Sequence, residues 1–194
     1  MNSEYKGSNL EQFYGSAASN ATILYTNDFE SGSGGFTQVS DAPHGWQRTV
    51  LGPATLDGHS KPKVVHFGKE VNGIPTDDSL KTGTFFTPKF DFSKVLPHDV
   101  VSISFNYFNK SEVGFDFVYF SVSLNNGKTW QELASSNKGI LKEQSTVWET
   151  VLLQFPDLSG NADSVQFAFQ FNSDELVVHQ GFFVDDFEIA TLPG

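Results

Sequence analysis

The chain has 194 residues with a formal net charge of −11, and it contains 20 Phe and no Cys. The absence of Cys excludes disulfides, thiol catalysis, Cys-ligated zinc and iron–sulfur clusters. The acidic balance lacks the basic footprint of a protein that binds nucleic acid or an anionic membrane, and no apolar run approaches the ~20 residues that cross a bilayer.

The first 21 residues are polar, with Ser, Asn and Gly spread among them. This composition is typical of a linker or an adaptable arm. No basic start leads into an apolar segment, so these residues do not resemble a signal peptide. We therefore divide the chain into an arm over residues 1–21 and one folded domain over residues 22–194.

From residue 22 onward, short β-forming segments alternate with turn signals, which is typical of a sandwich or a barrel. One of these signals, Asn126-Gly127, predicts a hairpin turn. The strands are predicted over residues 23–29, 47–50, 64–67, 83–86, 100–109, 117–124, 129–134, 146–155, 164–172 and 181–190. Three of them alternate strictly between apolar and polar residues, so each is expected to place one face on a core and the other toward solvent. No segment carries a sustained helical period, and the fold class is therefore all-β.

Acidic residues stand near both ends of the predicted domain. Asp28 and Glu30 lie at the end of the first predicted strand, and Asp185 and Asp186 lie within the last. Asp185 is expected to share one face with Phe183, Phe187 and Ile189. A carboxylate on such an apolar face is costly unless it is paired, protonated or bound to metal. If the first and last strands are neighbours, these carboxylates meet, and calcium is the cation that prefers such oxygen ligands. Alternatively, the aspartates cap turns and the glutamates are solvated.

A second oxygen-rich site is conceivable just before the strand predicted at residues 117–124. Its candidate metal ligands are Glu112 and Asp116, with Asp77 and Asp78 as further acidic residues. Ordinary loop carboxylates are the simpler interpretation of these residues.

Uncharged polar side chains occupy strand positions where an acidic protein usually displays Lys and Glu. Amide and hydroxyl groups near aromatic rings suit neutral sugars, which form hydrogen bonds and stack on rings. The candidate ligand-contacting residues are Ser102, Asn106, Tyr119, Gln166, Gln170, Asn172 and Trp46. The alternative is that these faces lie under loops or against a neighbouring domain, with the Trp side chains completing the core.

Several segments occur in an order that resembles the jelly-roll modules of secreted bacterial proteins. They are NDFESGSGGF, VVHFGKE, SLKTGTFFTPKFDFS, VSISFNYFNKSEVGFDFVYFSVSLNNGKTW and GFFVDDFEI. Those modules include the MAM-like domain of immune-inhibitor-A metalloproteases and the cleaved-adhesin modules of surface proteases; carbohydrate-binding modules with a β-sandwich fold are more loosely similar.

The resemblance covers about residues 22–191. It implies a two-sheet antiparallel jelly-roll sandwich, with a calcium ion held by Asp28, Glu30 and one or both of Asp185 and Asp186. The chain departs from true MAM domains in having no Cys, so their disulfide-dependent features do not transfer.

These observations predict a non-catalytic, calcium-dependent binding or adhesion module of a secreted or cell-surface protein, recognising a glycan or a peptide. The alternatives are an accessory domain docked on the neighbouring domains of a secreted protease or hydrolase, and a self-assembling extracellular subunit whose arm adds a strand to a neighbour. An enzyme is not expected, because the 5 His residues are scattered without an H-E-x-x-H or a G-x-S-x-G motif.

Overall fold

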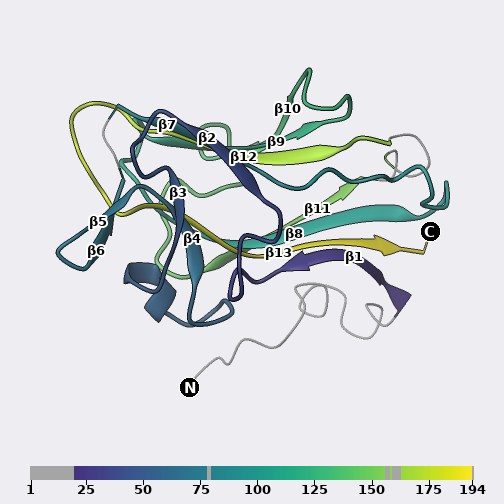
Figure 1. Ribbon diagram of the computed structural model, residues 1–194, viewed down its shortest axis with the longest axis horizontal. Coiled ribbons are helices and arrows are strands. Elements are labelled where there is room, and N and C mark those ends of the chain that lie inside the picture. The colour runs from purple at the N-terminus through teal and green to yellow at the C-terminus, as the bar shows by residue number, and fades with distance from the viewer. Residues whose placement is uncertain (1–19, 78–79, 156–157, 159–162, 194) are drawn as a thin grey trace.

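The computed structural model describes residues 20–77, 80–155, 158 and 163–193. These residues form two antiparallel sheets packed face to face (Figure 1). Sheet A has the order β11–β8–β13–β4–β3 with β1 also paired to β13, and sheet B has the order β10–β9–β12–β7–β2. Among the described residues, no helix has both the length and the apolar character needed to cross a membrane.

The strands of sheet A are β1 (Thr22–Asn27), β3 (Trp46–Thr49), β4 (Val64–Phe67), β8 (Val100–Lys110), β11 (Glu149–Phe155) and β13 (Gly181–Leu192). Those of sheet B are β2 (Thr37–Ser40), β7 (Thr82–Phe86), β9 (Phe117–Ser123), β10 (Gln131–Ser135) and β12 (Gln166–Asn172). A small separate ribbon consists of β5 (Lys69–Val71) and β6 (Ile74–Thr76), and a 3₁₀ helix, η2, spans Gly52–Thr55.

Aromatic rings from the alternating strands fill the space between the sheets. Phe105 of β8 is fully buried, and its ring lies 4.8 Å from the rings of both Phe120 on β9 and Phe169 on β12. Their polar sequence neighbours point to the other side of each sheet, as the period of two predicts. The predicted all-β, two-sheet fold is therefore confirmed.

The structure corrects the predicted strands at several points. Strands β2, β5 and β6, of 4, 3 and 3 residues, were not predicted. The first strand ends at Asn27 and not at residue 29, since Phe29 has a φ of 54°. The predicted Asn-Gly turn is confirmed: Asn126 and Gly127 have φ angles of 64° and 83° and connect the paired strands β9 and β10. The predicted arm lies, except for residues 20–21, outside the described residues.

The centre of sheet A is β13, which pairs with β8 along one side and with β1 and β4 along the other. The first and last strands of the described chain are thus neighbours, as the purple and yellow ribbons show (Figure 1). The β13–β8 register shifts between Asp185 and Glu188, where a β-bulge inserts one extra residue.

The packing of sheet B against sheet A makes a prediction at Gly83 on β7. A Cβ atom there would overlap the ring of Phe67, which is itself fully buried and wedged between Trp46 and Phe171. We expect Gly83→Ala to lower the free energy of unfolding by about 1–3 kcal/mol in urea denaturation. The cost should shrink in a Phe67→Leu background. Gly32→Ala is the matched control, because a Cβ at Gly32 meets no atom within 4 Å; equal losses for the two glycines would contradict this packing.

Candidate functional site

A cluster of carboxylates forms where the β13 bulge meets the segment 50–63, here called the covering loop. Asp185 pairs with Asn106 in the ladder and faces away from the inter-sheet core. On this side Phe183 belongs to a second, smaller apolar cluster with Ala54, Val64, Phe108 and Trp148. The bulge then switches the alternation, so Phe187 packs in the main core. The sequence prediction that Asp185 shares one face with Phe183 is confirmed, and the extension of that face to Phe187 is wrong.

Asp185 is completely buried and is held by groups from the covering loop. Its Oδ2 lies 2.8 Å from His59 Nδ1 and accepts a hydrogen bond from Ser60 Oγ at 3.0 Å, while its Oδ1 has no hydrogen-bond partner among the described residues. The other ring nitrogen of His59 lies 3.2 Å from the carbonyl oxygen of Ala54, which only accepts, so Nε2 carries a hydrogen. Burial, followed by repulsion from Asp186, raises the pKa of Asp185 to about 10. Burial lowers the pKa of His59 to about 4, and the pair therefore shares its proton in the neutral form.

Asp186 occupies the bulge itself, with a φ of 50°. Its Oδ2 accepts hydrogen bonds from the Ser60 backbone N–H at 2.9 Å and from Asn106 Nδ2 at 2.8 Å. The Thr150 hydroxyl donates to Asn106 Oδ1 at 2.7 Å and so fixes the orientation of that amide. Burial raises the pKa of Asp186, so in this setting the second carboxyl also resists ionisation.

Asp28 and Glu30 reach the same neighbourhood from the end of β1. The Ser60 hydroxyl lies 3.3 Å from the carbonyl oxygen of Asp28, and the Lys63 backbone N–H donates to Glu30 Oε1 at 2.8 Å. Repulsion from Glu30 contributes to the raised pKa of Asp185, and repulsion from Asp28 contributes to that of Asp186. The structure therefore brings the predicted residues of the two chain ends together. Within the described residues, however, no three His, Asp or Glu side chains are already arranged to hold a metal ion.

Glu112 and Asp116 are placed differently. Asp116 is buried, and its two oxygens accept hydrogen bonds from the backbone N–H groups of Glu112 at 2.9 Å and of Asp174 at 3.0 Å. It ties the loop before β9 to the loop before β13, which is a structural role that needs no ion. Asp77 accepts a backbone hydrogen bond from His179, and Asp78 lies outside the described residues.

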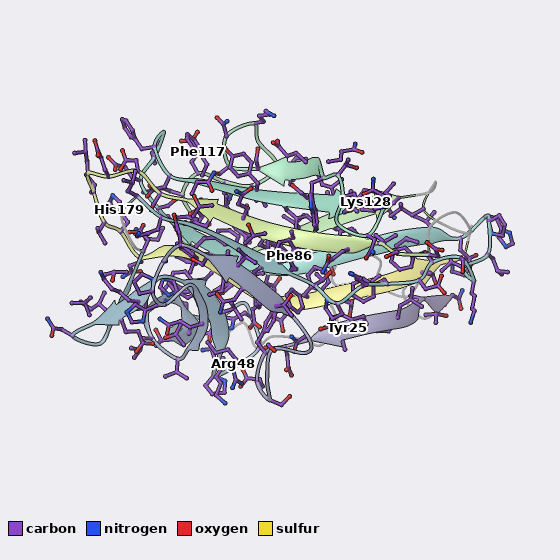
Figure 2. The ribbon with its side chains drawn as sticks, turned by 45° about the horizontal axis from the view of Figure 1, so that its top comes forward. Tyr25, Arg48, Phe86, Phe117, Lys128 and His179 are labelled. Carbon is purple, nitrogen blue, oxygen red and sulfur yellow. The ribbon has the colours of Figure 1, made fainter. Side chains whose placement is uncertain are left out.

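A second candidate site is a groove of about 200 Å³ on the outer face of sheet B. It is lined by Thr84, Phe86, Ser121, Trp130, Ala168 and Gln170. The rings of Phe86 and Trp130 lie 5.5 Å apart at an angle of 49°, and Trp130 is 38% exposed. Figure 2 shows Phe86 on this sheet, with Phe117 and Lys128 toward its two ends.

The outward positions of the three central strands of sheet B are uncharged throughout. The register aligns Gln170 with Thr84 on one side and Tyr119 on the other, all facing away from the core. The outward residues of β7, β9 and β12 are Thr82, Thr84, Phe86, Phe117, Tyr119, Ser121, Ser123, Gln166, Ala168, Gln170 and Asn172. The predicted ligand-contacting residues Tyr119, Gln166, Gln170 and Asn172 thus share one face.

Solved structures resemble this fold, whereas no family model and no curated protein sequence matches the chain. TmCBM61, solved with β-1,4-galactotriose, is 14% identical with a TM-score of 0.53, over 84% of this chain and 92% of that one. The C-terminal family 22 carbohydrate-binding module of Clostridium thermocellum Xyn10B is 11% identical with a TM-score of 0.53, over 88% and 93%. The K3 cleaved-adhesin domain of Lys-gingipain from Porphyromonas gingivalis is 14% identical with a TM-score of 0.54, over 88% and 98%.

At such identities these likenesses show the fold alone. They confirm the jelly-roll sandwich and the resemblance in fold to cleaved-adhesin and carbohydrate-binding modules. The resemblance to the MAM-like domain of immune-inhibitor-A proteases stays a prediction.

Three of the residues predicted to contact a glycan do not line the groove. Ser102 and Asn106 lie on β8 in the middle of sheet A and are 1% and 0% exposed. Trp46 is 3% exposed and packs against Phe67 and Phe85 in the main core. None of the three faces the groove, because the alternation of a strand shows which residues share a side and not whether that side is open to solvent.

The sequence prediction also missed the aromatic pair of the groove. Phe86 could have been found, since it follows the alternation of the predicted strand at residues 83–86. Trp130 comes from the loop before β10, and only the folded structure brings its ring to Phe86.

The buried pair His59–Asp185 predicts how stability depends on pH in the presence of a chelator. The folded state keeps the proton of Asp185 up to a pKa of about 10, whereas the unfolded state loses it near 3.8, so this group's contribution falls as pH rises between them. His59 acts oppositely between about 4 and 6.5, where the unfolded state binds the extra proton. The two effects on stability offset each other between about pH 4 and pH 6.5, and only the Asp185 effect remains at higher pH.

We therefore expect the urea midpoint in EDTA to decline from pH 7 to pH 9. Asp185→Asn should make this decline shallower. Part of the decline should remain, because the pKa of Asp186 is also raised in the folded state. The exposed Asp57 is the control, because its pKa is lowered and Asp57→Asn should leave the slope unchanged. An equal slope in Asp185→Asn and the parent would contradict the prediction.

Proposed function

We propose that this protein is a non-catalytic module that binds a neutral glycan in the groove of sheet B. The observation that carries the proposal is the composition of the groove, where the exposed Trp130 lies beside Phe86 and the other lining residues are two hydroxyl side chains, one amide and one alanine. The apolar face of a sugar ring stacks on an aromatic ring, and its hydroxyls exchange hydrogen bonds with amides and hydroxyls. The carbohydrate-binding modules among the similar structures support this choice of ligand.

A glycan fits this groove better than a peptide does. The groove lies on the face of strands β7, β9 and β12, whose backbone edges are already paired within sheet B. A peptide that binds by adding a strand needs a free edge, which this face does not offer. Charged peptide side chains would also find no partner among the lining residues.

Binding without hydrolysis follows from the same composition. Glycoside hydrolysis requires a pair of carboxyl groups at the scissile bond, and no lining residue of the groove is titratable at neutral pH. The neighbouring Glu132, which pairs with Ser121 in the ladder, is engaged by the Ser135 hydroxyl at 2.9 Å and by Lys138 Nζ at 3.2 Å.

We propose further that the carboxylate cluster at the β13 bulge binds calcium as a structural ion. The residues fit such an ion: Asp185 Oδ1 is buried without a hydrogen-bond partner among the described residues, and Ser60 contacts both the Asp186 carboxyl group and the backbone carbonyl of Asp28. Glu30 and Asp28 are near enough for their charges to raise the pKa values of Asp185 and Asp186. Calcium would supply positive charge to a group of oxygens that otherwise resists ionisation. Asp28 and Glu30 would then link the end of β1 to β13, and millimolar calcium outside cells matches a secreted or cell-surface protein.

The glycan proposal predicts that the aromatic pair dominates affinity. We expect Trp130→Ala and Phe86→Ala each to weaken binding by about 2 kcal/mol, or roughly thirtyfold, measured by calorimetry on the best ligand from an array of neutral and acidic glycans and peptides. Phe115→Ala is the matched control, since Phe115 is an aromatic residue exposed in the loop before β9. Binding to no glycan at all would favour an accessory, domain-docking role.

The calcium proposal predicts a shift in thermal stability. At 100 times its dissociation constant, calcium should add ~2.7 kcal/mol, which raises the melting temperature by roughly 5–10 °C for a domain of this size. Asp186→Asn should abolish the rise and Asp57→Asn should preserve it. An identical melting temperature in EDTA and in calcium would contradict the proposal.

A further inference from the structure

The free edges of the two sheets meet at β2 and β3 and leave a cavity between them. Among the described strands, β2 pairs with β7 alone and β3 with β4 alone, and residues 41–45 connect the two. The side chain of Gln38 on β2 bonds the backbone N–H and carbonyl of Trp46 on β3. The cavity, here called the seam cavity, has a volume of about 180 Å³. It shares no lining residue with the groove of sheet B, and Figure 2 shows Arg48 of the seam and Phe86 of the groove at separate places on the molecule.

The floor of the seam cavity is a stack of aromatic rings. The ring of Phe85 lies 4.7 Å from that of Phe36 at 28°, and 5.5 Å from that of Trp46 at 17°. Rings stacked in this way turn their faces to one another and their edges outward, and the edge of an aromatic ring attracts the face of another ring. The indole Nε1 of Trp46, one of the lining residues, is buried and donates to none of the described residues.

The rim of the cavity carries one formal charge, which is positive. Arg48 is the sole arginine of the chain. It pairs with Val65 as Trp46 pairs with Phe67, so its side chain lies on the core-facing side of β3. Its Nη1 donates to the carbonyl oxygens of Phe29 at 3.1 Å and of Glu30 at 3.3 Å, which fixes the guanidinium. The remaining donors of the fork have no partner among the described residues, and a fixed guanidinium with free donors recognises a carboxylate.

We propose that the seam cavity binds a small aromatic carboxylate. The ring of the ligand lies against the edges of the Phe36, Phe85 and Trp46 rings, and its carboxylate meets Arg48. The amides of Gln38 and Gln47, which also line the cavity, are engaged by backbone groups of Trp46 and Gly68. The volume is below the roughly 300–1,000 Å³ of pockets for drug-sized ligands, so it admits one ring with its acid group and excludes a sugar chain. A free aromatic acid and the C-terminal residue of a peptide both offer this chemistry.

Indole N–H signals of the ¹⁵N-labelled full chain test the proposal directly, with Trp46→Phe assigning the Trp46 signal. The probes are phenylacetate and N-acetylphenylalanine, each compared with its uncharged amide. We expect the acids to shift the Trp46 signal saturably while the signals of Trp130 and Trp148 stay in place, and the amides to bind at least about tenfold more weakly. Tighter binding of N-acetylphenylalanine assigns the site to a peptide C-terminus, and tighter binding of phenylacetate assigns it to a free acid.

Variants separate the guanidinium from the cavity. Arg48→Gln should weaken the acids at least about tenfold, and Lys94→Gln, the same change of charge at an exposed lysine elsewhere, should have no effect. Since Arg48 also holds two backbone carbonyls, Ser33→Phe, at another residue that lines the cavity, provides a second route: the larger side chain obstructs the cavity and leaves those hydrogen bonds in place. The proposal is overturned if no acid shifts Trp46 at about 20 mM, or if acids and amides bind alike. If the Arg48→Gln variant binds the acids as the parent does but self-associates, Arg48 instead protects a free strand edge from pairing with another copy.

Discussion

The burial of two adjacent carboxyl groups at the bulge of β13 is the constraint on which the rest of sheet A depends. β13 is the central strand, so the bulge decides which residues on each side of it enter the main core. Burying Asp185 and Asp186 is costly unless their oxygens are satisfied, and His59, Ser60 and Asn106 supply most of the partners. The covering loop and the end of β1 are thereby drawn to the same point of the sheet.

The outer faces of the two sheets therefore differ: that of sheet A is covered at the bulge, and that of sheet B is open. The bulge side of sheet A is closed by the covering loop and its small apolar cluster, and polar groups such as Asn106 and Thr150 bond to each other there. Sheet B has its outer face open and its inner face fixed by fully buried rings such as Phe120, Phe167 and Phe169. A groove built on strands that are locked from behind keeps its side chains in place before a ligand arrives, which is the arrangement that recognition requires.

The acidic charge of the chain is distributed in the same way. Carboxylates gather at the bulge, where an ion can offset them, and the outward residues of β7, β9 and β12 carry no charge. The single arginine stands at the seam between the sheets, where its guanidinium holds the loop after β1. The residues that give the chain its net charge of −11 thus lie outside the outward positions of these three strands, and the proposed glycan surface is uncharged.

The sequence by itself determined the all-β class, the sides of β8, β9 and β12, and the meeting of the two acidic chain ends. Alternation with a period of two is a local signal, and it correctly places Tyr119 and Gln170 on one face. Only the tertiary structure decided that Asn106 is buried, that the bulge turns Phe187 into the core, and that Trp130 reaches Phe86. These outcomes depend on contacts between residues far apart in the chain, and a strand's own pattern cannot show what covers it or which loop closes over it.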